Sequence, residues 1–189
     1  MAVTKEEIAA RAASVAFGKP LVMNVLRAII IETIVDAALG AGWKWCSGDY
    51  NGWDFEHTDR TRLEVKQSAA LQSWPTTKES AAIFDIAPRA GYWVDGIRWV
   101  KETARHAHIY VFARHPVTDI ARADHRDPSQ WDFYVVPSSK LPSSTLLRKS
   151  QRTIRLASII PLSSAKCNFG ELDAVIEEAR ARLRPQMQF

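Results

Sequence analysis

The stretch WDFEHTDRTRLEVKQS, at residues 53–68, decides the fold prediction. Apolar and polar side chains alternate in its two ends, 53–57 and 62–68, and the polar residues around Asp59 are typical of a turn. A turn centred on Asp59 pairs Asp54 with Glu64 and Glu56 with Arg62. The stretch therefore predicts an antiparallel β-hairpin.

The register of this hairpin assigns each side chain to one face of the sheet, because side chains alternate along a strand. The charged residues then share one face, namely Asp54, Glu56, Arg62, Glu64 and Lys66. The apolar residues share the other face, namely Trp53, Phe55, Leu63 and Val65. A slip of one residue would bury the charges, so the apolar pattern specifies the register.

The charged face carries a possible site for hydrolysis of a phosphodiester. Carboxylate oxygens suit hard cations, so Asp54 and Glu64 are candidate ligands of Mg²⁺ or Mn²⁺, and the Val65 backbone carbonyl is a candidate further ligand. Lys66 would stabilise charge on the reacting phosphate or help to position the attacking water. The pattern alone does not separate this site from the solvated outer face of an ordinary hairpin.

Residues 52–74 resemble the core of the PD-(D/E)XK nucleases, the restriction-endonuclease-like superfamily. The resemblance rests on Asp54, on EVKQS at 64–68 and on LQSW at 71–74. It implies an α/β fold with a central mixed β-sheet flanked by helices. It also implies that Asp54 and Glu64 bind the metal and that Lys66 is the catalytic lysine.

The resemblance implies roles for two further residues. Glu32, in the preceding helical segment, matches an acidic residue that many members add to the metal site. An ordinary solvent-facing glutamate is the alternative for Glu32. Gln67 matches a glutamine that follows the lysine in some members and would orient the lysine or a phosphate. Trp53 stands where the family often has proline.

The activity that the resemblance implies is Mg²⁺-dependent cleavage of DNA by an endonuclease, which is a phosphodiester hydrolase. Because two-fold symmetric DNA sites favour two-fold symmetric enzymes, we expect a homodimer. The alternative from another class is a non-catalytic nucleic-acid-binding or assembly module on the same fold. A nuclease acting on RNA is a third hypothesis.

Size and composition fit one globular domain spanning residues 1–189. The chain is 47% hydrophobic and carries 25 Lys and Arg against 21 Asp and Glu, which gives a net charge of +4. This charge is compatible with a polyanionic partner. We find no apolar run of membrane-spanning length and no signal-peptide pattern. The two cysteines, Cys46 and Cys167, have no metal-ligand spacing, so a reducing cytoplasm is the expected compartment.

The remaining elements are expected around the hairpin. A capping box at 4–7 predicts a helix that ends at Gly18, and Pro20 is expected to open a second helix that ends near Leu39. Strands are predicted at 43–46, 81–86, 109–113 and 131–136, with the third fully buried. Residues 88–98 have the composition of a loop, and the capping-box pattern at 168–171 predicts a final helix.

Two further groups of residues are candidates for nucleic-acid contact. Residues 133–170 contain no acidic residue, so basic side chains there are candidates for gripping phosphates, against the alternative of a solvated basic loop: Arg148, Lys149, Arg152 and Arg155. Trp93 and Trp99 are the least core-like tryptophans and are candidates for stacking on bases.

His106 and His108 are two residues apart, but Zn²⁺ sites usually need three or four ligands, so ordinary histidines are expected.

Overall fold

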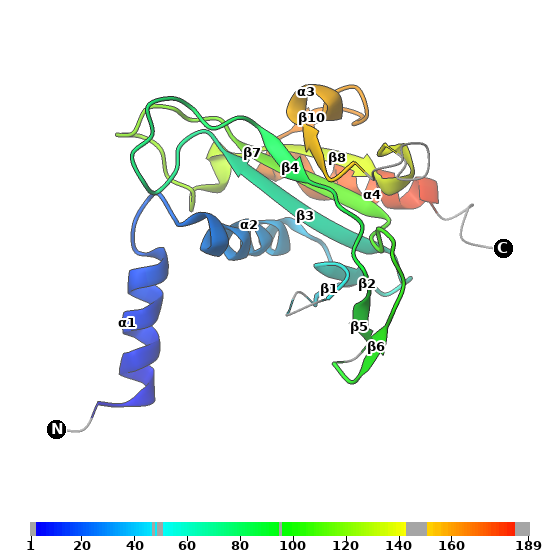
Figure 1. Cartoon of the computed structure of the whole chain (residues 1–189), viewed down its shortest axis with the longest axis horizontal. Helices are drawn as coiled ribbons and strands as arrows, with labels where there is room; N and C mark the ends of the chain where they lie inside the picture. Colours follow the sequence, from blue (N-terminus) through cyan, green and yellow to red (C-terminus); the bar gives the residue numbers. More distant parts are fainter. Residues whose placement is uncertain (1–2, 47, 49–50, 95, 143–150, 184–189) are drawn as a thin grey trace.

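The computed structural model describes residues 3–46, 48, 51–94, 96–142 and 151–183, and it is a mixed α/β fold around a six-stranded sheet (Figure 1). The strands follow one another across the sheet in the order β1 (Trp43–Trp45), β2 (Phe55–His57), β3 (Arg62–Ala69), β7 (Ile109–His115), β8 (Asp132–Pro137) and β10 (Lys166–Cys167). The β3–β7 pair is parallel and the other pairs are antiparallel, so the sheet is mixed, as predicted.

Two helices, α2 (Asn24–Ala38) and α4 (Leu172–Leu183), cover one face of this sheet. Ile31 and Val35 of α2 and Ile176 of α4 pack there against Leu63 and Val111 of the sheet. Every residue of β7 is buried, which confirms the prediction of a buried strand at 109–113. This apolar layer holds β3 rigidly against the helices, because interiors are close-packed.

A smaller layer covers part of the opposite face. It consists of β4 (Ile83–Asp85), β9 (Thr153–Arg155) and the short helix α3 (Leu156–Ile159). Phe84 and Ile154 pack there against Phe112 and Val136 of the central sheet. The predicted strand at 81–86 therefore exists, but it pairs with β9 in a separate two-stranded sheet.

The first helix, α1 (Lys5–Phe17), begins at the predicted capping box. Thr4 Oγ1 accepts a hydrogen bond from Glu7 N, and Glu7 Oε2 accepts one from Thr4 N. None of the residues of α1 is buried, and Figure 1 shows the helix standing away from the sheet. Its apolar side chains, including Ile8 and Val15, are exposed.

The second helix begins later than predicted. Pro20 does not open α2, because long-range hydrogen bonds hold the residues after it in a bend. His125 N donates to Pro20 O at 2.9 Å, and Val22 N donates to His125 Nδ1 at 3.0 Å. The first bond occupies the Pro20 carbonyl, which a helix starting at Pro20 would offer to the N–H four residues later, and α2 starts at Asn24 instead.

The prediction of a loop at 88–98 is wrong for its second half. Tyr92–Val94 forms strand β5 and pairs with β6 (Arg98–Val100), in a small hairpin outside the central sheet (Figure 1). Gly96 has a φ of 66°, and Ile97 N donates to Val94 O at 3.0 Å, which closes the turn. The Asp-Gly dipeptide at 95–96 is the sequence signal for such a turn.

The short 3₁₀ helices are η1 (Pro128–Gln130), η2 (Ser138–Lys140) and η3 (Phe169–Glu171), the last at the predicted capping box before α4.

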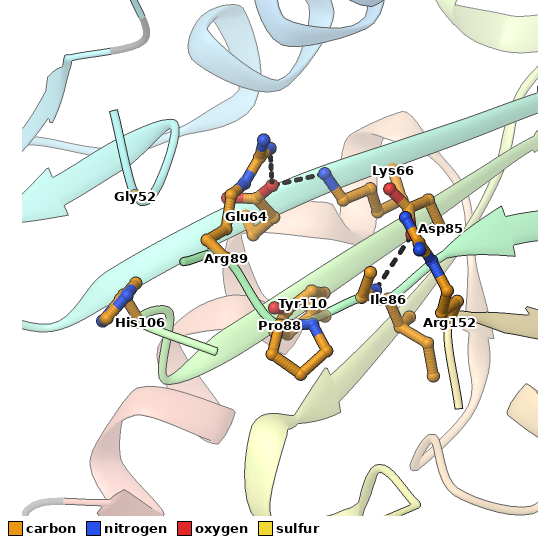
Figure 2. A pocket seen from close by; sticks show the side chains of 11 residues that line it. Gly52, Glu64, Lys66, Asp85, Ile86, Pro88, Arg89, His106, Tyr110 and Arg152 are labelled. Atoms are coloured by element: carbon orange, nitrogen blue, oxygen red, sulfur yellow. Dashed lines mark hydrogen bonds and ion pairs between the residues drawn. The ribbon is translucent and has the colours of Figure 1, made fainter. Parts of the chain in front are cut away.

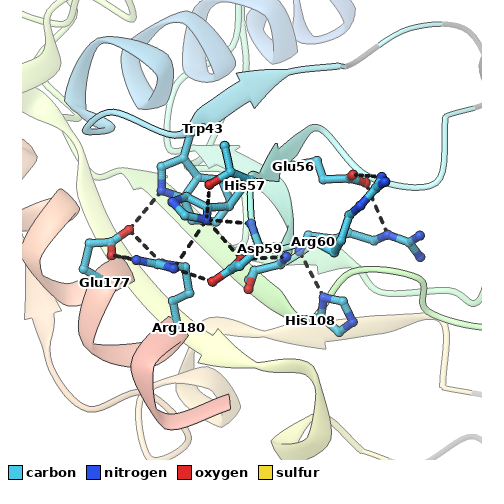
Figure 3. A network of polar contacts seen from close by, with 11 residues as sticks. Trp43, Glu56, His57, Asp59, Arg60, His108, Glu177 and Arg180 are labelled. Atoms are coloured by element: carbon cyan, nitrogen blue, oxygen red, sulfur yellow. Dashed lines mark hydrogen bonds and ion pairs between the residues drawn. The ribbon is translucent and has the colours of Figure 1, made fainter. Parts of the chain in front are cut away.

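The decisive hairpin has the predicted register, since Glu56 pairs with Arg62. Its turn is anchored to α4 by a polar network, which Figure 3 shows. Arg180 of α4 donates to Asp59 and to Glu177, and the Trp43 indole donates to Glu177 at 3.0 Å. The bonds that Asp59 accepts from Thr61, Arg180 and His57 hold the pKa of its carboxyl well below the usual range. The turn is therefore held to the helical layer by charge-assisted bonds.

One face assignment in this hairpin is wrong. Trp53 was expected beside Phe55 and Leu63, but it packs at the edge of the opposite apolar layer. Its ring lies under the Arg62 guanidinium, 3.7 Å from the centroid, and 5.2 Å from the Tyr92 ring. The cause is that β2 begins only at Phe55, so strand alternation does not extend to Trp53.

Candidate active site

The hairpin ends beside a cluster of charged side chains. The β2–β3 ladder stops at the Phe55–Leu63 pair, one residue short of the expected Asp54–Glu64 pair, and Asp54 N donates to Leu63 O at 2.9 Å. The Asp54 side chain turns back onto β3, where its Oδ2 accepts the Val65 N–H at 2.7 Å. This bond holds the Asp54 carboxylate against the strand that carries Glu64.

A pocket of about 330 Å³ lies at this place. Its walls come from several elements: α2 contributes Glu32, the start of the hairpin Asp54, and β3 Glu64 and Lys66. The structure therefore brings the predicted carboxylates and the predicted lysine to one pocket. Glu32 is half-buried there, and its Oε2 accepts the Trp45 indole N–H at 3.1 Å. This position differs from that of an ordinary solvent-facing glutamate.

Glu64 is the most deeply buried of these carboxylates, with 4% of its side chain exposed. Its Oε1 accepts from Lys66 Nζ and, at 3.3 Å, from Arg89 Nη2, as Figure 2 shows. A buried charge without partners would cost several kcal/mol, on the order of the effective desolvation of one ion. The two cations supply the partners that Glu64 needs.

The negative charge of an ionised Asp54 is less well neutralised by its neighbours than that of Glu64. Burial raises the pKa of its carboxyl from 3.8 to about 8, and repulsion from Glu64 and Glu32 adds to this effect. Lys66 and the Val65 N–H act in the opposite direction but do not cancel it. The pocket thus disfavours a charged Asp54, so this carboxyl holds its proton near neutral pH unless a bound cation takes the place of the proton.

Gln67 faces the other side of β3. Its Oε1 accepts from Arg27 Nε at 2.7 Å, and its Nε2 donates to Asn24 Oδ1 at 3.1 Å. Arg27 is buried and also donates to Gln72. Among the described residues, the hydrogen bonds of Gln67 therefore connect it to α2 rather than to Lys66, although it lines the same pocket.

Two residues of the site were missed by sequence reasoning. Asp85, at the end of β4, and Arg89, four residues later, both line the pocket with Glu64 and Lys66. A polar residue that ends an apolar strand was a weak signal for Asp85. Nothing in the local pattern marked Arg89, because its place depends on how the segment after β4 crosses the sheet.

A second cavity of about 180 Å³ adjoins the first and shares Glu64, Lys66, Asp85 and Arg89 with it (Figure 2). Its other walls include the residues Gly52, His106, Tyr110 and Arg152. The predicted DNA contact Arg152 therefore lies beside the carboxylate pocket, and Arg155 lies on β9 with its side chain exposed. Arg148 and Lys149 fall outside the described residues.

Of the candidate histidines and tryptophans, His106 lines the second cavity, whereas His108, Trp93 and Trp99 line neither cavity. The His106 ring packs 4.5 Å from the Tyr92 ring, and His108 Nδ1 accepts the Arg62 N–H at 3.0 Å. Trp93 and Trp99 form an edge-to-face pair on the β5–β6 hairpin and remain partly exposed. Their role in base stacking stays a prediction.

The donor chemistry fits a hard divalent cation with an open coordination sphere. Within the described residues, no three His, Cys, Asp or Glu side chains are drawn together into a ready-made ligand cluster. Mg²⁺ is ordinarily held by one or two carboxylates together with waters and phosphate oxygens, so Asp54 and Glu64 are sufficient protein ligands for it.

No protein-family model matches the chain, and no curated protein matches it either. Of the helices described, none is both long and apolar enough to cross a membrane.

Proposed function

We propose that the chain is a Mg²⁺-dependent DNA endonuclease of the PD-(D/E)XK class, with a restriction-endonuclease-like core. The observation that carries this proposal is the pocket that Glu32, Asp54, Glu64 and Lys66 line together. Three carboxylates from separate elements, next to a lysine, are costly to assemble without a function for their charge.

The proposed roles follow from the contacts of each side chain. Asp54 and Glu64 hold Mg²⁺ or Mn²⁺, with the Val65 carbonyl as a further ligand and Glu32 supporting the site. A bound Mg²⁺ would polarise a phosphoryl oxygen and lower the pKa of a coordinated water. Among the described residues, the Val65 N–H is the hydrogen-bond donor to the Asp54 carboxylate and contacts Oδ2, so Oδ1 is the oxygen that would bind the cation.

Lys66 is held in place before the substrate arrives. Its Nζ donates to Glu64, and only 20% of its side chain is exposed, so its charge stands at the wall of the pocket. A preorganised cation beside the scissile phosphate stabilises the charge that develops there and costs no reorganisation during the reaction. Gln67, bonded to Arg27, fixes the segment that follows Lys66.

DNA and a second copy of the chain are the proposed partners. Arg152 lines the second cavity and Arg155 is exposed on β9, and both would contact phosphates. Exposed apolar side chains on α1 and α2, including Val15 and Val25, are surface that a second copy would cover. Light scattering of the purified protein measures the mass directly, and a monomer at micromolar concentration would contradict the dimer.

The test of the activity is cleavage of supercoiled plasmid with Mg²⁺ and with excess chelator. We expect nicked or linear product only with the metal, and none from Asp54→Asn or Glu64→Gln. Competition between DNA and RNA substrates separates the RNA-nuclease alternative.

One observation favours the non-catalytic alternative. Glu64 already has two cationic partners, so the pocket does not require a metal to satisfy this carboxylate. Under that alternative the wild type binds DNA but leaves plasmid intact with every divalent cation tested.

A further inference from the structure

Arg89 is the residue of the pocket whose position the proposed chemistry leaves unexplained. Its Nη2 lies 3.3 Å from Glu64 Oε1, the oxygen that also accepts from Lys66 Nζ (Figure 2). One oxygen of a proposed metal ligand is thus shared by two protein cations. A divalent cation that binds this oxygen has to compete with both.

The two cations differ in how easily they can leave. Lys66 lies two residues from Glu64 on the same strand and is 20% exposed, so it has little room to move. The Arg89 side chain is 51% exposed and approaches from a loop. The Arg89 backbone is anchored, because it exchanges two hydrogen bonds with Ala104, at 2.9 and 3.1 Å. The side chain can therefore swing while its Cα stays fixed.

Arg89 also stands where a substrate phosphate would pass. It lines both cavities, with Asp54 in the first and Arg152 in the second. A guanidinium carries five N–H donors and binds phosphate through paired hydrogen bonds. Once the metal has taken Glu64, a substrate phosphate is therefore the better partner for the Arg89 guanidinium.

We propose that Arg89 is an exchangeable counter-ion: it neutralises Glu64 in the metal-free protein and moves to a non-bridging oxygen of the substrate phosphate when the metal binds. This inference rests on the proposed nuclease function. It predicts that the same side chain weakens metal binding and speeds cleavage, and a merely structural residue would not have these opposed effects.

The test uses Arg89→Gln, which removes the charge but keeps a polar side chain. Titration of the DNA-free protein with Mn²⁺ in a calorimeter should give about fivefold tighter binding than the wild type, the equivalent of one partly exposed ion pair. At saturating Mn²⁺, plasmid cleavage should fall roughly tenfold to a hundredfold, as on loss of one charge-stabilising group. Arg89→Lys, which keeps a charge without the forked donors, should bind Mn²⁺ nearly as the wild type does and cleave at an intermediate rate.

Arg98→Ala is the matched control, because Arg98 is an exposed arginine of β6 that lines neither cavity. It should match the wild type in both measurements. Unchanged Mn²⁺ affinity in Arg89→Gln overturns the counter-ion role, and wild-type cleavage at saturating Mn²⁺ overturns the phosphate role. If the wild type neither binds Mn²⁺ nor cuts DNA, the proposed function itself fails, and this inference falls with it.

Discussion

Replacing Asp54 with asparagine should stabilise the protein at alkaline pH while it removes a metal ligand. The Asp54 carboxyl lies mostly but not fully buried beside Glu64 and Glu32, and burial together with the repulsion of these neighbours raises its pKa from 3.8 to about 8. Asparagine has the same shape, and its Oδ1 can accept the Val65 N–H that now lies 2.7 Å from the carboxylate. The substitution therefore removes the repelling charge and keeps the hydrogen bond.

The sign and size of the effect follow from proton linkage. A carboxyl whose pKa is raised by folding contributes stability that is complete below its unfolded value, near 3.8, and is lost as the pH rises through about 8. If the whole pKa shift acted on stability, the free energy of unfolding would fall by on the order of 5 kcal/mol, because each pKa unit corresponds to about 1.4 kcal/mol. Since Asp54 is partly exposed and water screens its charge, we expect about 2 kcal/mol, or about 4–8 °C in Tm for a chain of this length.

The assay is thermal unfolding in chelator at about pH 9 and about pH 5. Asp54→Asn should melt higher than the wild type at the alkaline pH, and the difference should be clearly smaller at the acid pH, because the wild type starts to lose stability only above the unfolded pKa near 3.8. Millimolar Mg²⁺ should then raise the wild-type Tm more than that of the variant, because only the wild type binds the cation well.

Asp36→Asn is the control for the loss of an acidic side chain, because Asp36 is an exposed aspartate on α2. It should leave the Tm nearly unchanged at both pH values. An Asp54→Asn variant that melts below the wild type at alkaline pH in chelator would refute the reasoning. A Tm increase that is as large at acid pH as at alkaline pH would refute it as well.

Three further variants test other parts of the site. Lys66→Met should lower cleavage about a hundredfold or more, with metal affinity by calorimetry unchanged or slightly higher; wild-type cleavage would contradict the proposed role. Reversing Arg152 and Arg155 to Glu should weaken DNA binding and reduce the slope of log affinity against log salt by about 2, measured by fluorescence anisotropy, and an unchanged slope would exclude both as phosphate contacts. Arg27→Met should destabilise the protein by about 2–4 kcal/mol in urea unfolding, because the Gln67 amide oxygen loses its buried donor; a loss below about 0.5 kcal/mol would show that this bond is dispensable.

The hairpin could be predicted from sequence because its information is local. Alternation over 53–68 is sufficient to pair Glu56 with Arg62 and to place Glu64 and Lys66 on one face. The same rule fails for Trp53, since it applies only where the chain is a strand, and the strand begins at Phe55. The local pattern therefore predicted the register correctly and the outer end of the hairpin incorrectly.

The parts that could not be predicted depend on partners far away in the chain. The start of α2 is set by two hydrogen bonds with His125, which donates its N–H to Pro20 O and accepts the Val22 N–H, a contact across about a hundred residues. Asp85 and Arg89 reach the pocket because β4 pairs with β9, a strand that lies in the basic stretch near the other end of the chain. Periodicity and spacing carry no information about such pairings.

The two buried carboxylates of the pocket differ in how well nearby cations and donors neutralise them, and this difference is the strongest physical argument for a ligand. Glu64, the more buried carboxylate, has two cationic partners, whereas the Val65 N–H and the charge of Lys66 do not offset burial and the repulsion of two neighbours at Asp54. A cluster kept only for stability would be expected to replace Asp54 by a neutral residue, because the exchange preserves its hydrogen bond and removes the repulsion. An ionisable Asp54 in these surroundings is a local conflict of the kind that folded proteins tolerate at functional sites. A divalent cation would resolve it at Asp54 and Glu64 together, and Arg89 would then be released from Glu64.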